Sequence, residues 1–422
     1  MLAFPTGDHT SPPGRPHPDH AHPDRRPSGS DLDLGAVHSP TSVHPPVPPA
    51  LPASSSDPGV GVGEDLSAYG WDAGWDDAFA PYRVAGLVPG RITRVDRGGC
   101  EVVTAGGRSW PATAPTGPAD TVPCTGDWAA LRPGPVAGPA TRERLAVAAL
   151  LPRRTALVRA SSSRRSDPQP LAANVDIVAV AVALTAPINL GRLERLVTLA
   201  WESGARPLVV LTKADQAGGA GSETVRTAEA EAEAAAPGVD VVTTSAADGS
   251  GLDALAVLLA GTSVLIGTSG TGKSTLTNAL LGTETQQVRA VRSADGKGRH
   301  TTVRRELLPL PGGGVLIDTP GLRGVGLWAA DDGLSQAFAD VEELAAGCRF
   351  GDCEHRTEPG CAVLAAVDAG TLPARRLASY RRLLRENAYT AARGDARLRA
   401  EQERQWRSIS KEQRRMYRER GR

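Results

Sequence analysis

The chain has 422 residues, which is too long for one ordinary hydrophobic core and therefore predicts two or three domains. Its 47 basic and 47 acidic residues cancel, so the net charge indicates no class of partner. The sequence has no apolar run of about 18 residues or more and no apolar segment near its start, so we expect neither a membrane-spanning helix nor a secretory signal.

The N-terminal part, residues 1–80, is predicted to be a disordered extension. Its first 62 residues contain 14 Pro and six of the eight His, with almost no apolar periodicity. The His side chains offer metal ligands, but the low-complexity composition favours a solvated tail.

Residues 81–155 change to short β-like runs separated by Gly-rich turns. So many short strands predict a small barrel of the oligonucleotide-binding (OB) type, although the pattern fits an SH3-like barrel as well. Cys100 and Cys124 fall in this region, and we expect both to pack in its core. The runs are Arg91–Val95, Cys100–Thr104, Arg108–Ala112 and Asp127–Leu131.

Strand and helix signals alternate over residues 165–330, which predicts a doubly wound α/β domain. Strands are expected at Val175–Leu184, Pro207–Leu211, Val239–Thr243, Ser263–Ile266 and Val315–Ile317. Helices are expected at Leu190–Ser203, Thr224–Ala236, Leu252–Ala260 and Lys273–Leu281.

A phosphate-binding loop follows the strand at Ser263–Ile266 and opens the next helix. Glycines in such a loop let backbone N–H groups surround phosphate oxygens, while Lys273 reaches the β and γ phosphates and Ser274 offers its hydroxyl to Mg²⁺. We therefore expect Lys273 to act in catalysis as well as in binding. The nucleotide-binding residues predicted here are Gly267, Thr268, Ser269, Gly270, Thr271, Gly272, Lys273, Ser274 and Thr275.

The segment Asp318-Thr-Pro-Gly321 follows the last strand of the domain. A carboxylate at a strand end can hold Mg²⁺, and the backbone N–H of Gly321 can contact the γ phosphate. Asp318 and Gly321 are therefore added to the predicted nucleotide site.

Two further strand ends carry polar tetrapeptides that fit recognition of guanine. Asp215 can accept hydrogen bonds from the N1–H and the exocyclic amine of guanine, a pair that adenine does not offer. The stem of Lys213 can lie along the base, and the backbone after the next strand can contact guanine O6. The residues Thr212, Lys213, Asp215, Ser245 and Ala246 therefore predict GTP as the nucleotide.

These guanine motifs precede the phosphate loop, whereas in Ras-like GTPases the phosphate loop comes first. A circular permutation explains the reversal, because the termini of a compact domain often lie close together.

Residues 331–422 begin with acidic helices, pass a Cys/His cluster and end in two predicted basic helices, Pro373–Ala391 and Ala396–Arg418. The last 52 residues hold 15 Arg and one Lys against six acidic residues, which suggests an anionic partner, although such a face is often only solvated. Three thiolates and one imidazole make a complete tetrahedral set for one structural Zn²⁺ per chain. The predicted ligands are Cys348, Cys353, His355 and Cys361.

The permuted order, the segment Gly298-Arg-His300-Thr-Thr302, the barrel before the domain and the Cys/His module after it resemble the ribosome small-subunit-dependent GTPase A family. The stretches Asn174–Asp176 and Asn189–Leu193 match as well, so the resemblance covers about residues 85–390. It implies a permuted GTPase domain between an OB-type barrel and a zinc-binding helical module. It also implies a cytoplasmic, monomeric GTPase that uses Mg²⁺ with GTP, binds the small ribosomal subunit and its rRNA, and assists late maturation of that subunit, which stimulates hydrolysis.

The chain departs from the expected motifs at two positions. Thr212 stands where the family often has Asn, but it can still tie the base-binding loop to the phosphate loop. Leu322 stands where Ras-like enzymes place the Gln that positions water. His300 is the candidate for that role, with a simple rRNA contact as the alternative. Among the threonines after it, Thr302 is favoured over Thr301 as a Mg²⁺ ligand.

Two other functions fit the sequence. One is a different permuted GTPase that acts on the large subunit or on a protein partner. The other is a zinc-bearing RNA-binding protein with a vestigial nucleotide site. Measuring turnover with each purified subunit separates the three.

Overall fold

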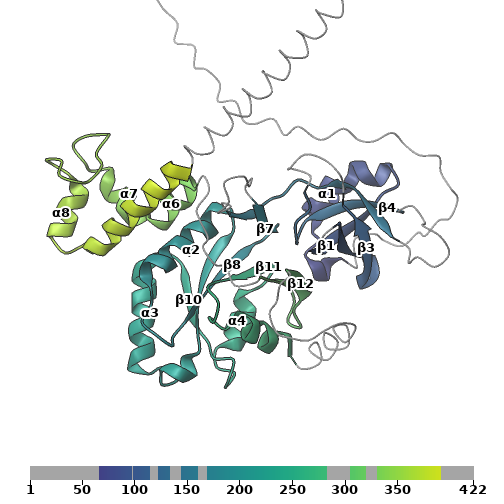
Figure 1. Ribbon diagram of the computed structural model, residues 1–422, viewed down its shortest axis with the longest axis horizontal. Helices are drawn as coiled ribbons and strands as arrows, with labels where there is room; N and C mark the ends of the chain where they lie inside the picture. Colours follow the sequence, from purple (N-terminus) through teal and green to yellow (C-terminus); the bar gives the residue numbers. More distant parts are fainter. Residues whose placement is uncertain are drawn as a thin grey trace, which may run out of the picture. The chain divides into compact units, whose positions relative to one another are not determined.

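The computed structural model describes residues 66–96, 98–114, 122–133, 144–159, 169–282, 305–319 and 330–390 (Figure 1). Within these ranges no helix combines the length and the apolar character needed to cross a bilayer.

An aromatic cap precedes the barrel. The 3₁₀ turn Ser67–Tyr69 leads into helix α1 (Ala73–Val84), whose N-cap Asp72 accepts a hydrogen bond from the backbone N–H of Trp75. Residues 66–80 are thus largely ordered, and the prediction that the disordered extension reaches residue 80 is wrong for them. The reason is that Trp75, Phe79 and Tyr82 form a buried face at helical spacing.

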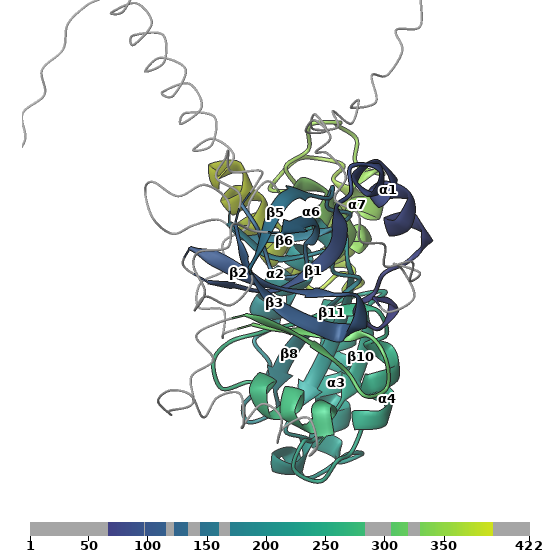
Figure 2. The same cartoon turned by 90° about the vertical axis from the view of Figure 1, so that its right-hand side faces the viewer.

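The barrel is closed by five strands in the order β1-β2-β3-β5-β4. Neighbouring strands are antiparallel except for β3 and β5, which pair in parallel. The strand order, with its parallel β3–β5 pair, is that of the OB type and not that of the all-antiparallel SH3-like alternative. Its strands are β1 (Val88–Asp96), β2 (Gly99–Thr104), β3 (Arg108–Thr113), β4 (Trp128–Pro133) and β5 (Leu145–Leu150); Figure 2 labels all of them except β4, which Figure 1 labels.

Both barrel cysteines are buried, as expected for core packing. Burial raises the pKa of Cys100 and of Cys124 to about 12, so neither thiol ionises at neutral pH.

A hairpin of β6 (Ala156–Arg159) and β7 (Gln169–Ala173) leads into a six-stranded sheet with the order β10-β9-β8-β11-β13-β12. The first five of these strands are parallel, and β12 pairs antiparallel at the edge. The five parallel strands match the predicted ones, whereas β12 was not expected. The bounds are β8 (Ile177–Ala183), β9 (Arg206–Thr212), β10 (Asp240–Thr243), β11 (Thr262–Ile266), β12 (Glu306–Pro309) and β13 (Val315–Asp318).

Helices cover both faces of this sheet (Figure 1). Val178 and Val180 of β8 pack in one buried cluster with α2 and α3, while Ile177 and Ala179 pack in a second cluster with α4. Successive residues of one strand thus pack in two hydrophobic clusters on opposite faces of the sheet, which confirms the doubly wound class. The helices are α2 (Leu190–Glu202), α3 (Glu223–Ala235), α4 (Leu252–Leu258) and a helix over 273–282.

The C-terminal module consists of α6 (Asp331–Ala337), α7 (Ala339–Ala345), α8 (Ala362–Asp368) and a helix over 374–390, here called the C-terminal helix. Phe338 and Tyr380 share one hydrophobic cluster with Leu193 of α2. The module therefore has a core in common with the α/β domain. The predicted helix Ala396–Arg418 lies outside the described residues.

One buried arginine, Arg376, links the C-terminal module to the α/β domain. Arg376 is 1% exposed and its guanidinium donates to Glu194 Oε1 at 3.1 Å, to both oxygens of Asp340 and to the backbone carbonyls of Ala235 and Ala337. A single side chain of the C-terminal helix thus binds α2, α7 and the ends of α3 and α6.

Candidate nucleotide and metal sites

The predicted nucleotide motifs lie at the ends of four strands of the parallel sheet, two on each side of β8. Thr212, Thr243, Ile266 and Asp318 are the last residues of β9, β10, β11 and β13. Because these strands are parallel, their carboxyl ends share one edge of the sheet, which is where open α/β sheets bind ligands. The permuted chain order therefore still assembles one site.

The phosphate loop connects β11 to the helix over 273–282. Gly267, Gly270 and Gly272 have φ values of 150°, 87° and 82°. A Cβ on Gly267 would lie 2.6 Å from the carbonyl oxygen of Ala181, so no larger residue fits there without a shift. The loop is thus held in a glycine-specific conformation against β8.

Lys273 and Asp318 are the buried charges of this site, 6% and 2% exposed. The ammonium of Lys273 donates to the carbonyl oxygens of Gly267 and Thr268, each at 2.9 Å, and so lies over the loop. Burial lowers the pKa of Lys273, and the charge of Asp318 opposes that shift. The carboxylate therefore helps to keep the ammonium charged.

The base-binding loop is tied directly to the phosphate loop. Thr212 Oγ1 donates to the carbonyl oxygen of Thr271 at 2.7 Å, so the link predicted for this threonine is present. Lys213 adopts a left-handed φ of 62°, and its Cε lies 3.6 Å from where a Cβ on Gly272 would be. The aliphatic stem of the lysine thus runs along the phosphate loop.

Asp215 is oriented by the segment after β10. The hydroxyl of Ser245, which is fully buried, donates to Asp215 Oδ1 at 2.8 Å. A cavity of about 190 Å³ opens beside this pair. It is lined by Thr212, Lys213, Asp215, Gln216, Thr244, Ala246, Ala247, Gly272, Thr275 and Leu276.

Most of the predicted nucleotide residues thus meet around the phosphate loop and this cavity, and Ser274 is exposed at the start of the helix. Gln216, Thr244, Ala247 and Leu276 also line the cavity but were not predicted. Their adjacency to the motifs was the only sequence signal available for them. The predicted residues His300, Thr302 and Gly321 lie outside the described residues.

The four predicted zinc ligands converge on one point. Their ligand atoms all lie within 4.8 Å of one another. Cys348 Sγ is 3.8 Å from Cys361 Sγ, and each lies 3.5 Å from His355 Nδ1. Ligands bound to Zn²⁺ at about 2.0–2.3 Å in a tetrahedron are separated by roughly 3.3–3.8 Å. The donor set and its spacing therefore fit a tetrahedral zinc ion.

Local backbone features position these ligands. His355 has a left-handed φ of 56°, which turns the chain between the two outer cysteines. Cys361 is the N-cap of α8, and its sulfur accepts from the backbone N–H of Leu364. The cluster is thus anchored on a helix that packs against α7.

The family model for the RsgA GTPase matches residues 150–328 of the chain. A small ribosomal subunit biogenesis GTPase RsgA from Streptomyces avermitilis is 58% identical over 344 residues, which cover 81% of this chain and 90% of that protein. A protein of the same name from Opitutus terrae is 43% identical over 361 residues, or 83% and 97% of the two chains. The crystal structure of YjeQ from Thermotoga maritima, at 23% identity, has a TM-score of 0.50 and covers 71% of this chain and 97% of that one, which supports the fold.

Proposed function

This chain belongs to the RsgA GTPase family, and from that premise we propose that it hydrolyses GTP to GDP and phosphate to assist late maturation of the small ribosomal subunit. The observation that carries the proposal is the convergence of a guanine-reading carboxylate, Asp215, and a phosphate-loop lysine, Lys273, at one edge of the sheet. The relatives are named for biogenesis of the small subunit, so that subunit and its rRNA are the proposed partners. We place the reaction in the cytoplasm and expect a monomer.

Different residues of the site would bind the phosphates, the guanine base and Mg²⁺. Backbone N–H groups of Gly267–Gly272 bind the phosphates, Lys273 contacts the β and γ phosphates, and Asp215 accepts hydrogen bonds from guanine. Ser274 and Asp318, with Thr302, would hold Mg²⁺, which neutralises charge on the phosphates when it is bound. These residues bind and orient the nucleotide but do not position the attacking water.

His300 is our candidate for positioning that water, because the side chain of Leu322 cannot form a hydrogen bond. His300 follows Gly296 and Gly298 in the sequence, and because glycine allows many backbone conformations, contact with a partner would select the one that brings the imidazole to the site. We therefore propose that docking on the small subunit completes the catalytic site.

Turnover should be weak in the free protein and strongly stimulated by purified small subunits, with little effect of large subunits. Ordering of the segment and positioning of a water together can contribute about three powers of ten or more in rate. His300→Ala should remove most of the stimulation and leave GTP affinity near normal, whereas the neighbouring control Ser293→Ala should keep it. Phosphate release measured with each subunit tests this expectation. Full stimulation of His300→Ala would reduce His300 to an rRNA contact.

We propose Zn²⁺ as the metal of the Cys/His cluster, in a structural role. Three sulfurs and one imidazole nitrogen fill the four tetrahedral positions and leave none open for a substrate. A metal bound there would hold together a polar loop between α7 and α8, most of whose residues are exposed.

Cys353→Ser should lower the zinc content well below one ion per chain and loosen the loop between α7 and α8, while GTP binding survives. The matched control Cys100→Ala removes a cysteine that is not a ligand and should keep about one zinc. Metal analysis of both purified variants, with GTP affinity as the second measurement, checks this. An unchanged zinc content in Cys353→Ser would show that the ligand set is wrong.

A further inference from the structure

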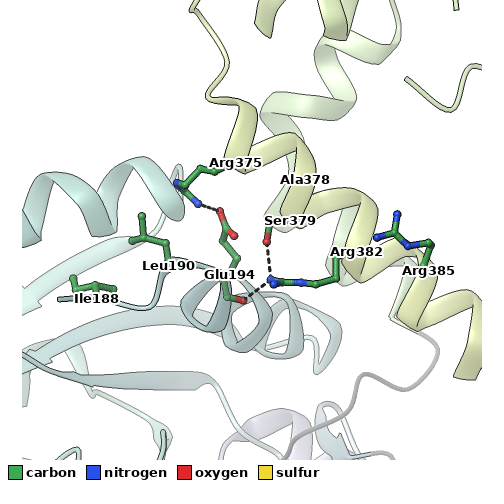
Figure 3. Close-up of a pocket in the computed structure, with 9 residues that line it drawn as sticks. Ile188, Leu190, Glu194, Arg375, Ala378, Ser379, Arg382 and Arg385 are labelled. Carbon is green, nitrogen blue, oxygen red and sulfur yellow. Dashed lines mark hydrogen bonds and ion pairs between the residues drawn. The ribbon is translucent and has the colours of Figure 1, made fainter. Parts of the chain in front are cut away.

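A second and larger cavity lies between α2 and the C-terminal helix, outside the nucleotide and metal sites (Figure 3). Its volume is about 560 Å³, within the range of pockets that hold a small ligand or a nucleotide. It is lined by Ile188, Leu190, Gly191, Glu194, Arg375, Ala378, Ser379, Arg382 and Arg385. Nothing in the proposed hydrolysis uses these residues.

The cavity exists because the C-terminal helix presents small residues at its centre. Ala378 and Ser379 face α2, and arginines precede and follow them on the same side of the helix, about one turn away. The apolar side chains of Ile188 and Leu190 form the opposite wall. The cavity thus combines a partly apolar lining with a rim of guanidinium groups.

The charge of this rim is positive and only partly neutralised. Glu194 is the one carboxylate in the lining, and its Oε1 already accepts from both Arg375 at 2.8 Å and Arg376 at 3.1 Å. Among the described residues, Arg382 donates to two uncharged groups, the carbonyl oxygen of Gly191 at 3.3 Å and the hydroxyl of Ser379 at 3.1 Å (Figure 3). Arg385 has no hydrogen bond or ion pair within the part of the chain that the structure describes.

We propose that this cavity, here called the arginine cavity, binds backbone phosphates of small-subunit rRNA. Guanidinium groups recognise phosphate through paired hydrogen bonds, and among the described residues no carboxylate pairs with Arg382 or Arg385. Beyond Thr390 the sequence continues with ten Arg and one Lys against five acidic residues, so the segment that follows the C-terminal helix in sequence has a net positive charge, which favours a polyanionic partner. The inference rests on the proposed function and names a docking site for it.

The double variant Arg382→Gln with Arg385→Gln should weaken binding to purified small subunits about tenfold near 0.15 M salt. It should also flatten the dependence of log affinity on log salt by about 1.5, because each lost phosphate contact removes roughly 0.7–0.9 from the slope. Ala378→Trp fills the cavity without changing charge and should weaken binding as well. The matched control, Arg206→Gln with Arg226→Gln, removes two exposed arginines outside the cavity and should bind within about twofold of the unmodified protein.

Basal GTP turnover without subunits should be the same in all these variants, which shows that each is folded. Equal affinity of the double variant and the control would overturn the proposal, and so would full affinity of Ala378→Trp. The same measurements with protein-free small-subunit rRNA separate the partners: a loss seen only with whole subunits assigns the cavity to an acidic ribosomal protein instead. If subunits fail to stimulate the unmodified protein, the proposed function fails, while a cavity-dependent loss of rRNA binding still supports this site.

Discussion

Asp215→Asn should convert a GTP-selective site into one that prefers xanthine nucleotides. Ser245 donates to Asp215 Oδ1, and an asparagine can keep that bond through its amide oxygen. Its NH₂ group would then face the N1–H and the amine of guanine. Because all of these groups are hydrogen-bond donors, neither hydrogen bond to guanine could form. Two unmade hydrogen bonds at about 1–3 kcal/mol each predict a loss of GTP affinity of roughly thirtyfold or more.

Affinities for GTP, XTP and ATP measured on the same preparation test this expectation. Xanthine carries a carbonyl where guanine has its amine, so XTP should gain affinity in the variant. Asp248→Asn is a suitable control, because Asp248 is an exposed neighbour that bonds to Ser250 and does not line the cavity. Equal binding of ATP and GTP by the unmodified protein would contradict the assignment of Asp215.

Arg376→Met should lower the free energy of unfolding by about 3–5 kcal/mol, the usual cost of removing one member of a buried ionic network. The substitution keeps much of the side-chain volume but leaves Glu194, whose side chain is fully buried, with the half-exposed Arg375 as its one remaining ion-pair partner among the described residues. It also removes the donors to Asp340 and to two backbone carbonyls, and the contact of the guanidinium with the ring of Phe338 at 4.1 Å. The C-terminal helix should therefore loosen from α2.

Denaturant unfolding, with hydrogen exchange of the C-terminal helix as a local measurement, checks this prediction. Arg375→Met is the matched control: it removes the other arginine bound to Glu194, but one that is 39% exposed, so we expect about 1 kcal/mol or less. Arg376→Lys should not restore stability, because an ammonium cannot reproduce the planar fork of donors. Equal destabilisation by Arg375→Met and Arg376→Met would show that the network is not the source of the effect.

The sequence was sufficient for the parts of the molecule that local patterns specify. Apolar runs such as Val175–Leu184 are long enough to identify buried parallel strands, and the phosphate loop carries its own glycine requirement at Gly267. The OB barrel was also recognisable, although β5 was not identified, since the run Leu145–Leu150 is apolar throughout and shows no alternation of polar and apolar residues.

Features that depend on distant residues were not predictable in this way. Arg376 and Glu194 are 182 residues apart in sequence, and an arginine in a basic helix gives no sign that it is buried. Strand β12 is a short edge strand that pairs, within the described residues, with β13 alone, and its sequence, Glu306–Pro309, has no strand-like alternation. The cavity residues Gln216 and Leu276 likewise owe their place to packing and to no motif.

The position of β8 in the sheet has a consequence for how the chain folds during synthesis. One edge of β8 pairs with β9, which follows it closely in sequence, but the other edge pairs with β11. Next to that second pairing, the backbone N–H of Thr262 donates to the carboxylate of Asp176, which lies 86 residues earlier in the sequence. At about 5–20 residues per second, an apolar strand edge therefore remains unpaired for several seconds after β8 emerges from the ribosome. Nascent chains that stall in this interval should be prone to pair with one another along β8, and chaperone dependence should be greatest there. The rearranged order of the motifs thus leaves the folded site intact but exposes the nascent chain to mispairing until β11 has been synthesised.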